Sequence, residues 1–151
     1  MLNPNSYDNT DFKKEWLQYW DREYKDGKII VTWCSNPNIQ TPVTVPVNVF
    51  TTVGPASSKK KDSDFTTAVI NAVTPDNKWF ILDMTRDKLN PTERVDLAFR
   101  LHKKFKAINT GYITVGFQGP DRHYIKRRMF EDNYFYSVEE LKTKQQRMIH
   151  R

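Results

Sequence analysis

Four aspartates of this chain could bind a divalent metal ion. Asp62 and Asp64 lie in a polar loop, whereas Asp83 and Asp87 lie at or just beyond the end of an apolar run. Magnesium and manganese prefer carboxylate and water ligands, so acids that converge in space could hold such an ion. A simpler interpretation, which we favour, makes Asp62 and Asp64 turn or loop acids and pairs Asp83 with a nearby Lys or Arg.

Basic side chains form two clusters that could contact nucleic acid. The chain has a net charge of +6 and a pI of about 9.4, and such a balance favours a polyanionic partner. Contacts to phosphates would position DNA without reading its sequence. A solubilising surface is the alternative interpretation. The clusters are Lys59, Lys60 and Lys61 in the polar loop, and Arg122, Lys126, Arg127 and Arg128 on a predicted helix.

Other chemistries have little support in the sequence. The single cysteine, Cys34, has no CxxC partner, and we expect it to be a small packed residue. His102, His123 and His150 lack the spacing of zinc ligands, and no GxxxxGK[ST] loop for ATP is present. We expect an intracellular protein, because no apolar run approaches the roughly 20 residues of a membrane span and residues 1–5 do not resemble a signal peptide.

The first part of the chain predicts a helix, a strand and a connector. Aromatic residues recur every three to four positions over residues 11–24, which is typical of an amphipathic helix that Asp26 and Gly27 would end. The apolar run at residues 29–34 predicts a short strand. Three prolines within residues 36–46 indicate an extended connector.

The rest of the chain predicts a sheet with flanking helices. Apolar and β-branched runs predict strands at residues 47–53, 65–73, 79–83 or slightly beyond, and 112–117. Pro75, Asp76 and Asn77 form a turn, so the second and third of these strands should make a hairpin. Three successive strands, a helix and another strand predict an α/β fold with a mixed sheet, in the order found in ribonuclease-H-like nucleases.

Two helices accompany these strands. Asn90 as cap, Pro91 at the first helical position and Glu93 at the third predict the start of the first helix, which residues 109–111 would end. Its basic residues, Arg94 among them, should mostly face away from the core. The second helix should begin at residues 119–121. The expected buried residues are Val95, Ala98, Leu101, Phe105 and Ile108 in the first helix, and Tyr124, Ile125, Met129 and Phe130 in the second.

Four segments occur in an order that is typical of one protein family. They are VGPASSKKKDSDFT at residues 53–66, WFILD at 79–83, LNPTER at 89–94 and VGFQ at 115–118. On these segments the chain resembles the C-terminal nuclease domain of the large terminase subunit of tailed phages. Residues 2–4 (LNP) and 11–17 (DFKKEWL) resemble the junction between its ATPase and nuclease domains, and residues 139–141 (EEL) and 144–149 (KQQRMI) resemble its later turns.

The resemblance implies a metal-dependent endonuclease that cuts concatemeric viral DNA during packaging. In such an enzyme one Mg or Mn ion activates water and a second stabilises the leaving oxygen. It implies a junction at residues 1–45 and a ribonuclease-H-like domain at 46–151 that is incomplete at its C-terminus. The implied location is the host cytoplasm, for a phage or prophage protein. The implied partners are double-stranded DNA and the portal, the small terminase subunit or the ATPase domain, with no membrane.

The chain departs from this family at its acidic positions. Gly54 aligns with the first family acid and Ile113 with the second, and a third lies in a C-terminal segment that has no counterpart up to Arg151. Asp64 aligns with an accessory acid and is a candidate catalytic residue and metal ligand. Asp83 is a candidate catalytic acid by its place in the chain. Gly54 and Ile113 favour a domain that has lost catalysis and keeps a DNA-binding or motor-assembly role.

Two alternatives remain at the sequence level. One is an active Mg- or Mn-dependent endonuclease with a rearranged or externally completed set of acids. The other is a phage protein that binds other packaging proteins rather than DNA.

Overall fold

The computed structural model describes residues 13–36, 39–55, 65–113 and 120–142. The chain divides into two compact units, Met1–Pro46 (unit one) and Val47–Arg151 (unit two).

Unit one contains a three-stranded antiparallel sheet. A short 3-10 turn, η2 (Lys14–Trp16), precedes β1 (Trp20–Lys25), β2 (Lys28–Asn36) and β3 (Ile39–Pro46), which lie in the order β1-β2-β3. Side chains alternate along β2, as expected for a strand with one covered face. Its buried residues are Ile29, Val31 and Trp33, whereas Cys34, expected to be packed, is exposed.

The prediction of a helix over residues 11–24 is wrong for residues 13–24, the part that the structure describes. Asp26 and Gly27 both have positive φ, 51° and 73°, and join β1 to β2 through a two-residue turn. A two-residue Asp-Gly connection with positive φ at both positions is a strong hairpin signal, so the turn sets the structure of the residues before it. The aromatic spacing suggested a helix, but pairing between β1 and β2 overrides it. This pairing runs from Trp20 opposite Trp33 to Lys25 opposite Lys28.

The predicted connector at residues 36–46 is extended, but it forms a paired strand, β3. Pro42 and Pro46 are tolerated because β3 lies at the edge of the sheet, where a missing N–H group can face outward. The Thr32 and Thr44 hydroxyl oxygens lie 2.9 Å apart across β2 and β3.

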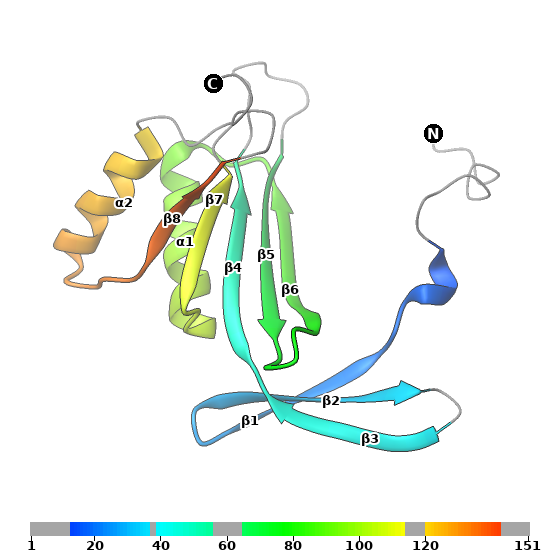
Figure 1. Cartoon of the computed structure of the whole chain (residues 1–151). Coiled ribbons are helices and arrows are strands. Elements are labelled where there is room, and N and C mark those ends of the chain that lie inside the picture. Colours follow the sequence, from blue (N-terminus) through cyan, green and yellow to red (C-terminus); the bar gives the residue numbers. More distant parts are fainter. Residues whose placement is uncertain (1–12, 37–38, 56–64, 114–119, 143–151) are drawn as a thin grey trace, which may run out of the picture. The chain divides into compact units, whose positions relative to one another are not determined.

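Unit two contains a five-stranded mixed sheet (Figure 1). Its strands lie in the order β6-β5-β4-β7-β8. β5 pairs antiparallel with both β4 and β6, β7 pairs parallel with β4, and β8 pairs parallel with β7. The predicted α/β mixed sheet is confirmed, and the arrangement is ribonuclease-H-like. The elements are β4 (Asn48–Gly54), β5 (Thr66–Val73), β6 (Trp79–Asp87), α1 (Pro91–Phe105), β7 (Asn109–Ile113), α2 (Pro120–Glu131) and β8 (Val138–Leu141).

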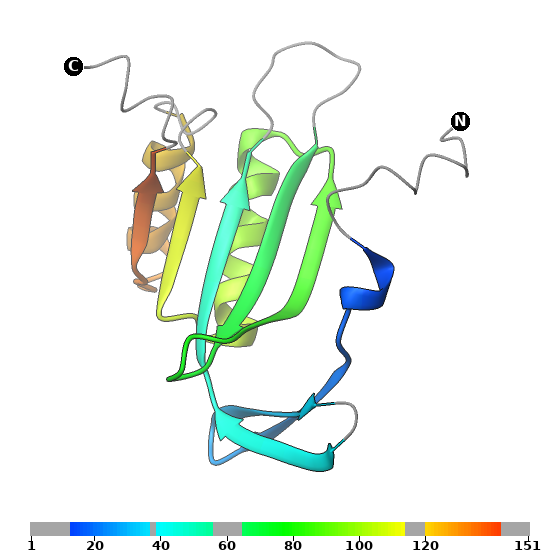
Figure 2. The ribbon, with the colours of Figure 1, turned by 45° about the vertical axis from the view of Figure 1, so that its right-hand side comes forward.

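Both helices cover the same face of this sheet (Figure 2). Alternate residues of β4 and β5 are buried on that face, and α1 contributes an apolar stripe to the same core. The opposite face, which no described helix of unit two covers, carries Trp79, Ile81 and Met84 of β6, each more than half exposed. The buried stripe of α1 contains Val95, Ala98, Leu101 and Phe105, as predicted.

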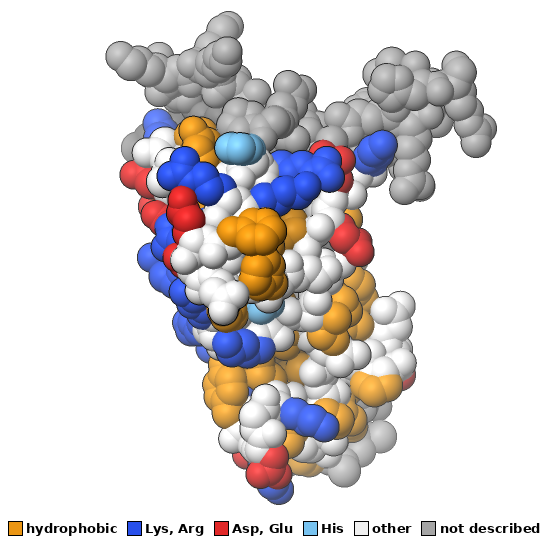
Figure 3. Space-filling view, turned by 90° about the vertical axis from the view of Figure 1, so that its left-hand side faces the viewer, with side chains coloured by type: hydrophobic (Ala, Val, Ile, Leu, Met, Phe, Trp, Pro, Cys, Tyr) orange, Lys and Arg blue, Asp and Glu red, His pale blue; other side chains and the backbone are white. Residues whose placement is uncertain are grey.

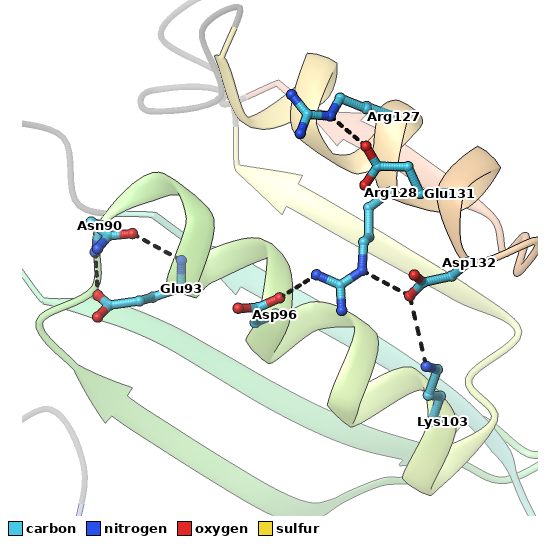
Figure 4. Close-up of polar contacts among 8 residues, drawn as sticks. All are labelled: Asn90, Glu93, Asp96, Lys103, Arg127, Arg128, Glu131 and Asp132. Carbon is cyan, nitrogen blue, oxygen red and sulfur yellow. Dashed lines mark hydrogen bonds and ion pairs between the residues drawn. The ribbon is translucent and has the colours of Figure 1, made fainter.

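Helix α1 begins as predicted and ends earlier. The Asn90 side chain accepts from the Glu93 N–H at 2.9 Å, and the Glu93 carboxylate accepts from the Asn90 N–H at 2.8 Å, a complete capping box (Figure 4). Lys106 adopts a left-handed conformation with φ of 51° and stops the helix. Ile108 is therefore outside α1 and exposed, and residues 109–111, predicted as the helix end, belong to β7.

Helix α2 is joined to α1 by a buried ion pair. Arg94 was expected to face away, but its guanidinium makes two hydrogen bonds of 2.8 Å to the buried Asp121 carboxylate, because the start of α2 lies beside the first turns of α1. In α2, Ile125 is buried as predicted, whereas Tyr124 and Phe130 are exposed. The predicted strand residues 114–117 lie outside the described residues.

Candidate functional site

The carboxyl ends of β4 and β7 bring together the two positions where the resembled family has acids. The strands pair in parallel from Phe50 opposite Asn109 to Val53 opposite Tyr112, so Gly54 and Ile113 both follow at the same end. A Cβ atom built on Gly54 would lie 3.7 Å from Ile113 Cδ1. The convergence expected from the family is therefore present, but a hydrogen atom and an aliphatic side chain supply no metal ligand.

A bulge in β6 decides where Asp83 lies. Ile70 is opposite Asp83 while Asn71 is opposite Ile81, so Leu82 is an extra residue in β6. An extra residue reverses the alternation of all side chains beyond it. Asp83 consequently shares the helix-covered face with Ile70, and its carboxylate lies 3.5 Å from Lys104 Nζ of α1.

The described acids do not form a metal site. Asp83 pairs with Lys104 and also accepts from the Met84 N–H at 2.8 Å, and Asp87 accepts from the Lys88 N–H at 2.8 Å. Among the described residues, no three His, Cys, Asp or Glu side chains are grouped so that they could hold a metal ion. Asp62 and Asp64 lie outside the described residues. The part of the site that the structure describes does not fit a divalent metal.

The same reversal places a cationic and aromatic pair at the end of the sheet where Gly54 lies. Arg86 is opposite Thr67, which is opposite Gly54. The Arg86 guanidinium lies 3.9 Å from the centre of the Phe65 ring, and Lys88 Nζ lies 5.4 Å from it. We call Phe65, Arg86 and Lys88 the strand-end platform. Such a group can bind a phosphate and present a ring face to a base.

The strand-end platform was missed by the sequence analysis. Arg86 and Lys88 stand beside Asp87, so the charge signs alternate and form no basic run. Only the pairing of β5 with β6, bulge included, turns Arg86 toward Phe65. The available signal in the sequence was that Arg86 and Lys88 follow the strand predicted at residues 79–83. The end of that strand lies near Gly54 in the sheet.

The basic residues predicted on α2 fall into two groups. Arg127 pairs with Glu131 at 2.7 Å, and Arg128 pairs with Asp132 and Asp96, each at 2.7 Å (Figure 4). Arg122 and Lys126 are exposed, and within the described residues neither forms an ion pair. On the side of unit two that carries α2 and β8, Lys and Arg side chains lie beside exposed hydrophobic ones (Figure 3). Lys59, Lys60 and Lys61 lie outside the described residues.

Comparisons with known proteins are sparse. No protein-family model matches the chain, and no curated protein sequence matches it. One similar solved structure is T. thermophilus RuvC in complex with a Holliday junction substrate, at a TM-score of 0.45 and 14% identity, over 64% of this chain and 67% of that chain. The order and direction of the strands carry the fold assignment. No helix in the described part of the chain is long and apolar enough to cross a membrane.

Proposed function

We propose that this chain is a nuclease-type domain of the terminase large-subunit kind that holds double-stranded DNA without cutting it. The observation that carries the proposal is the juxtaposition of Gly54 and Ile113 at the carboxyl ends of adjacent parallel strands. Metal-dependent cleavage needs carboxylates at such a point, because they bind the ions that activate water and stabilise the leaving group. Here the scaffold is kept and these two ligands are replaced.

Three features support DNA as the partner. The strand-end platform lies at the same end of the sheet as Gly54. Arg122 and Lys126 are cations that no described acid neutralises. The net charge of +6 favours association with a polyanion. A place in viral DNA packaging, beside the ATPase domain, the portal or the small terminase subunit, rests on the resemblance of the sequence.

Plasmid nicking with magnesium or manganese tests the loss of catalysis. We expect no cleavage by the unaltered chain and cleavage by a Gly54→Asp, Ile113→Glu double variant. A Cβ atom at position 54 would lie 3.1 Å from Thr67 Oγ1, so the variant should also be made with Thr67→Ala. Cleavage by the unaltered chain that disappears with Asp64→Ala would overturn the proposal and favour an active endonuclease with a rearranged acid set.

Binding of a short DNA duplex at several salt concentrations tests the second half of the proposal. We expect affinity to fall steeply with salt. An Arg86→Gln, Lys88→Gln double variant should reduce the slope by about 0.9 for each phosphate that it no longer neutralises. Lys78→Gln is a matched control, since Lys78 is exposed at the opposite end of the strands and pairs with Asp76. Salt-independent association, or an equal loss of affinity in the control, would instead favour a protein partner.

A further inference from the structure

A pocket of about 260 Å³ lies between α2 and β8. Ile125 and Met129 of α2 and Val138 of β8 supply its apolar lining. Its volume is slightly below the roughly 300–1,000 Å³ that is typical of sites for drug-sized ligands. The pocket therefore suits a small group rather than a large ligand or a folded segment.

Charged groups of both signs line the same pocket without pairing. Arg122 and Lys126 are four residues apart, so they share one side of α2, and Glu140 faces them from β8. All three are exposed, and among the described residues none of them forms an ion pair. The neighbouring Arg127 and Arg128, by contrast, are both paired with acids. The pocket thus keeps two cations and one carboxylate available to a ligand.

Tyr136 adds a polar group to the lining. Its ring stacks on His102 with centroids 4.4 Å apart and meets Phe99 edge-on at 5.1 Å, so its position is fixed. Its hydroxyl is buried and has no hydrogen-bond partner among the described residues. Burial raises the pKa of Tyr136, so the hydroxyl stays protonated and can donate.

We propose that this pocket binds a single unstacked nucleotide whose base carries an exocyclic amine. The base would lie against the apolar lining, its amine would donate to Glu140, and its phosphate would lie between Arg122 and Lys126. A bare phosphate would be repelled by Glu140, and an apolar side chain would make no contact with the three charged groups. A carboxylate that accepts from the cytosine amine is an established mode of base recognition, whereas thymine has no amine to donate.

Calorimetric titration of the full chain with dCMP, dTMP and deoxycytidine tests this proposal. We expect dCMP to bind roughly fivefold to a hundredfold more tightly than dTMP, as one specific base contact allows. Glu140→Ala should remove that preference. An Arg122→Gln, Lys126→Gln double variant should bring dCMP down to the affinity of deoxycytidine. Arg100→Gln removes an exposed cation of α1 outside this pocket; it is the control for loss of a surface cation and should change nothing.

The substituted side chains are exposed, so the variants should fold, and unchanged melting temperatures would verify this. Equal binding of dCMP and dTMP, no binding of either, or a preference that survives Glu140→Ala would overturn the proposal.

The nucleotide could be free or part of a DNA strand. Binding of a nucleotide within a DNA strand rests on the proposed DNA-holding function. Oligo-dC and oligo-dT single strands, beside a fully paired duplex, separate these sources. Tighter binding of oligo-dC than of dCMP, abolished by Glu140→Ala, would identify a strand. Binding of dCMP without any binding of duplex or single strands would support the nucleotide pocket and contradict the proposed DNA-holding function. Salt-dependent duplex binding without dCMP binding would support the DNA-holding function and contradict the nucleotide pocket.

Discussion

The Arg94–Asp121 pair is the most buried ion pair among the described residues. The Arg94 side chain is 11% exposed and the Asp121 side chain 2% exposed. Arg94 donates from Nε and Nη2 to the two carboxylate oxygens and from Nη1 to the Leu89 carbonyl oxygen at 3.2 Å. A bidentate pair of this kind fixes direction as well as distance, so it sets the position of the α2 N-terminus on α1.

Asp121→Ala should lower the free energy of unfolding by roughly 3–5 kcal/mol, because it leaves the Arg94 charge buried without a partner. Urea unfolding followed by circular dichroism would measure the loss. An Arg94→Met, Asp121→Leu double variant should be much less destabilised, since both charges are removed together. Glu131→Gln, which breaks the exposed pair with Arg127, should lower the free energy of unfolding far less than Asp121→Ala. Equal losses in Asp121→Ala and Glu131→Gln would contradict the structure.

His102 is held in one neutral form by its neighbours. Its Nε2 atom lies 3.0 Å from the Ala107 carbonyl oxygen, which can only accept, so Nε2 carries the hydrogen. Nδ1 then accepts from the Tyr134 hydroxyl at 2.9 Å. Burial, with a smaller effect of the nearby Lys106 charge, lowers the pKa of His102 below its ordinary value of 6.5.

This lowered pKa predicts a loss of stability in acid. Above pH 6.5 His102 is neutral in both the folded and the unfolded chain, so its contribution is fully present. Below pH 6.5 the unfolded chain binds a proton that the folded chain does not, and stability falls until the pH reaches the folded pKa. Melting temperatures from pH 8 to pH 5 should show this fall, and His102→Gln should reduce it. If the melting temperatures of the unaltered chain and of His102→Gln fell equally with pH, His102 would not be the source of the acid sensitivity.

At the scale of elements, the sequence predicted unit two well. Strands β4, β5 and β6 and the start of α1 were predictable, because apolar runs, a turn and a capping box are local signals. In unit one the strand predicted at residues 29–34 is confirmed as β2, but β1 and β3 were missed, since aromatic spacing outweighed the Asp26-Gly27 turn and the prolines indicated a connector. The convergence of Gly54 and Ile113 followed from the family order. The strand-end platform did not, because it depends on the bulge at Leu82, which only pairing with β5 creates.

The close contact of β7 with β8 leads to an element-scale prediction. A Cβ atom on Gly111 would lie 2.5 Å from Leu141 Cδ1, closer than packed atoms approach. Because Leu141 is exposed and its side chain can rotate away, Gly111→Ala should destabilise unit two by only about 1 kcal/mol, the cost of a less favourable rotamer. Leu141→Ala in the same chain should recover part of this loss, as a double-mutant cycle in urea would measure. Additive losses would indicate that β8 does not lie against Gly111.

At the scale of the whole molecule, stability should not depend on divalent metal. The described residues contain no metal-binding group, and a ligand stabilises a fold only if it binds the folded state. Magnesium, manganese or a chelator should leave the melting temperature unchanged. The Gly54→Asp, Ile113→Glu variant should melt lower in chelator, where its new acids repel each other, and recover in magnesium. A metal-dependent shift in the unaltered chain would point to ligands outside the described residues.

The position of β4 has a consequence for synthesis of the protein. β4 is the first strand of unit two to leave the ribosome, yet in the finished sheet it pairs with β5 on one side and with β7 on the other. The nascent chain can form the β4-β5-β6 meander early, but the parallel edge of β4 stays open until α1 and β7 have been made. Open strand edges recruit other chains, so ribosome pausing at a stage when the chain has emerged only as far as residues 88–108 should favour aggregation of the nascent protein.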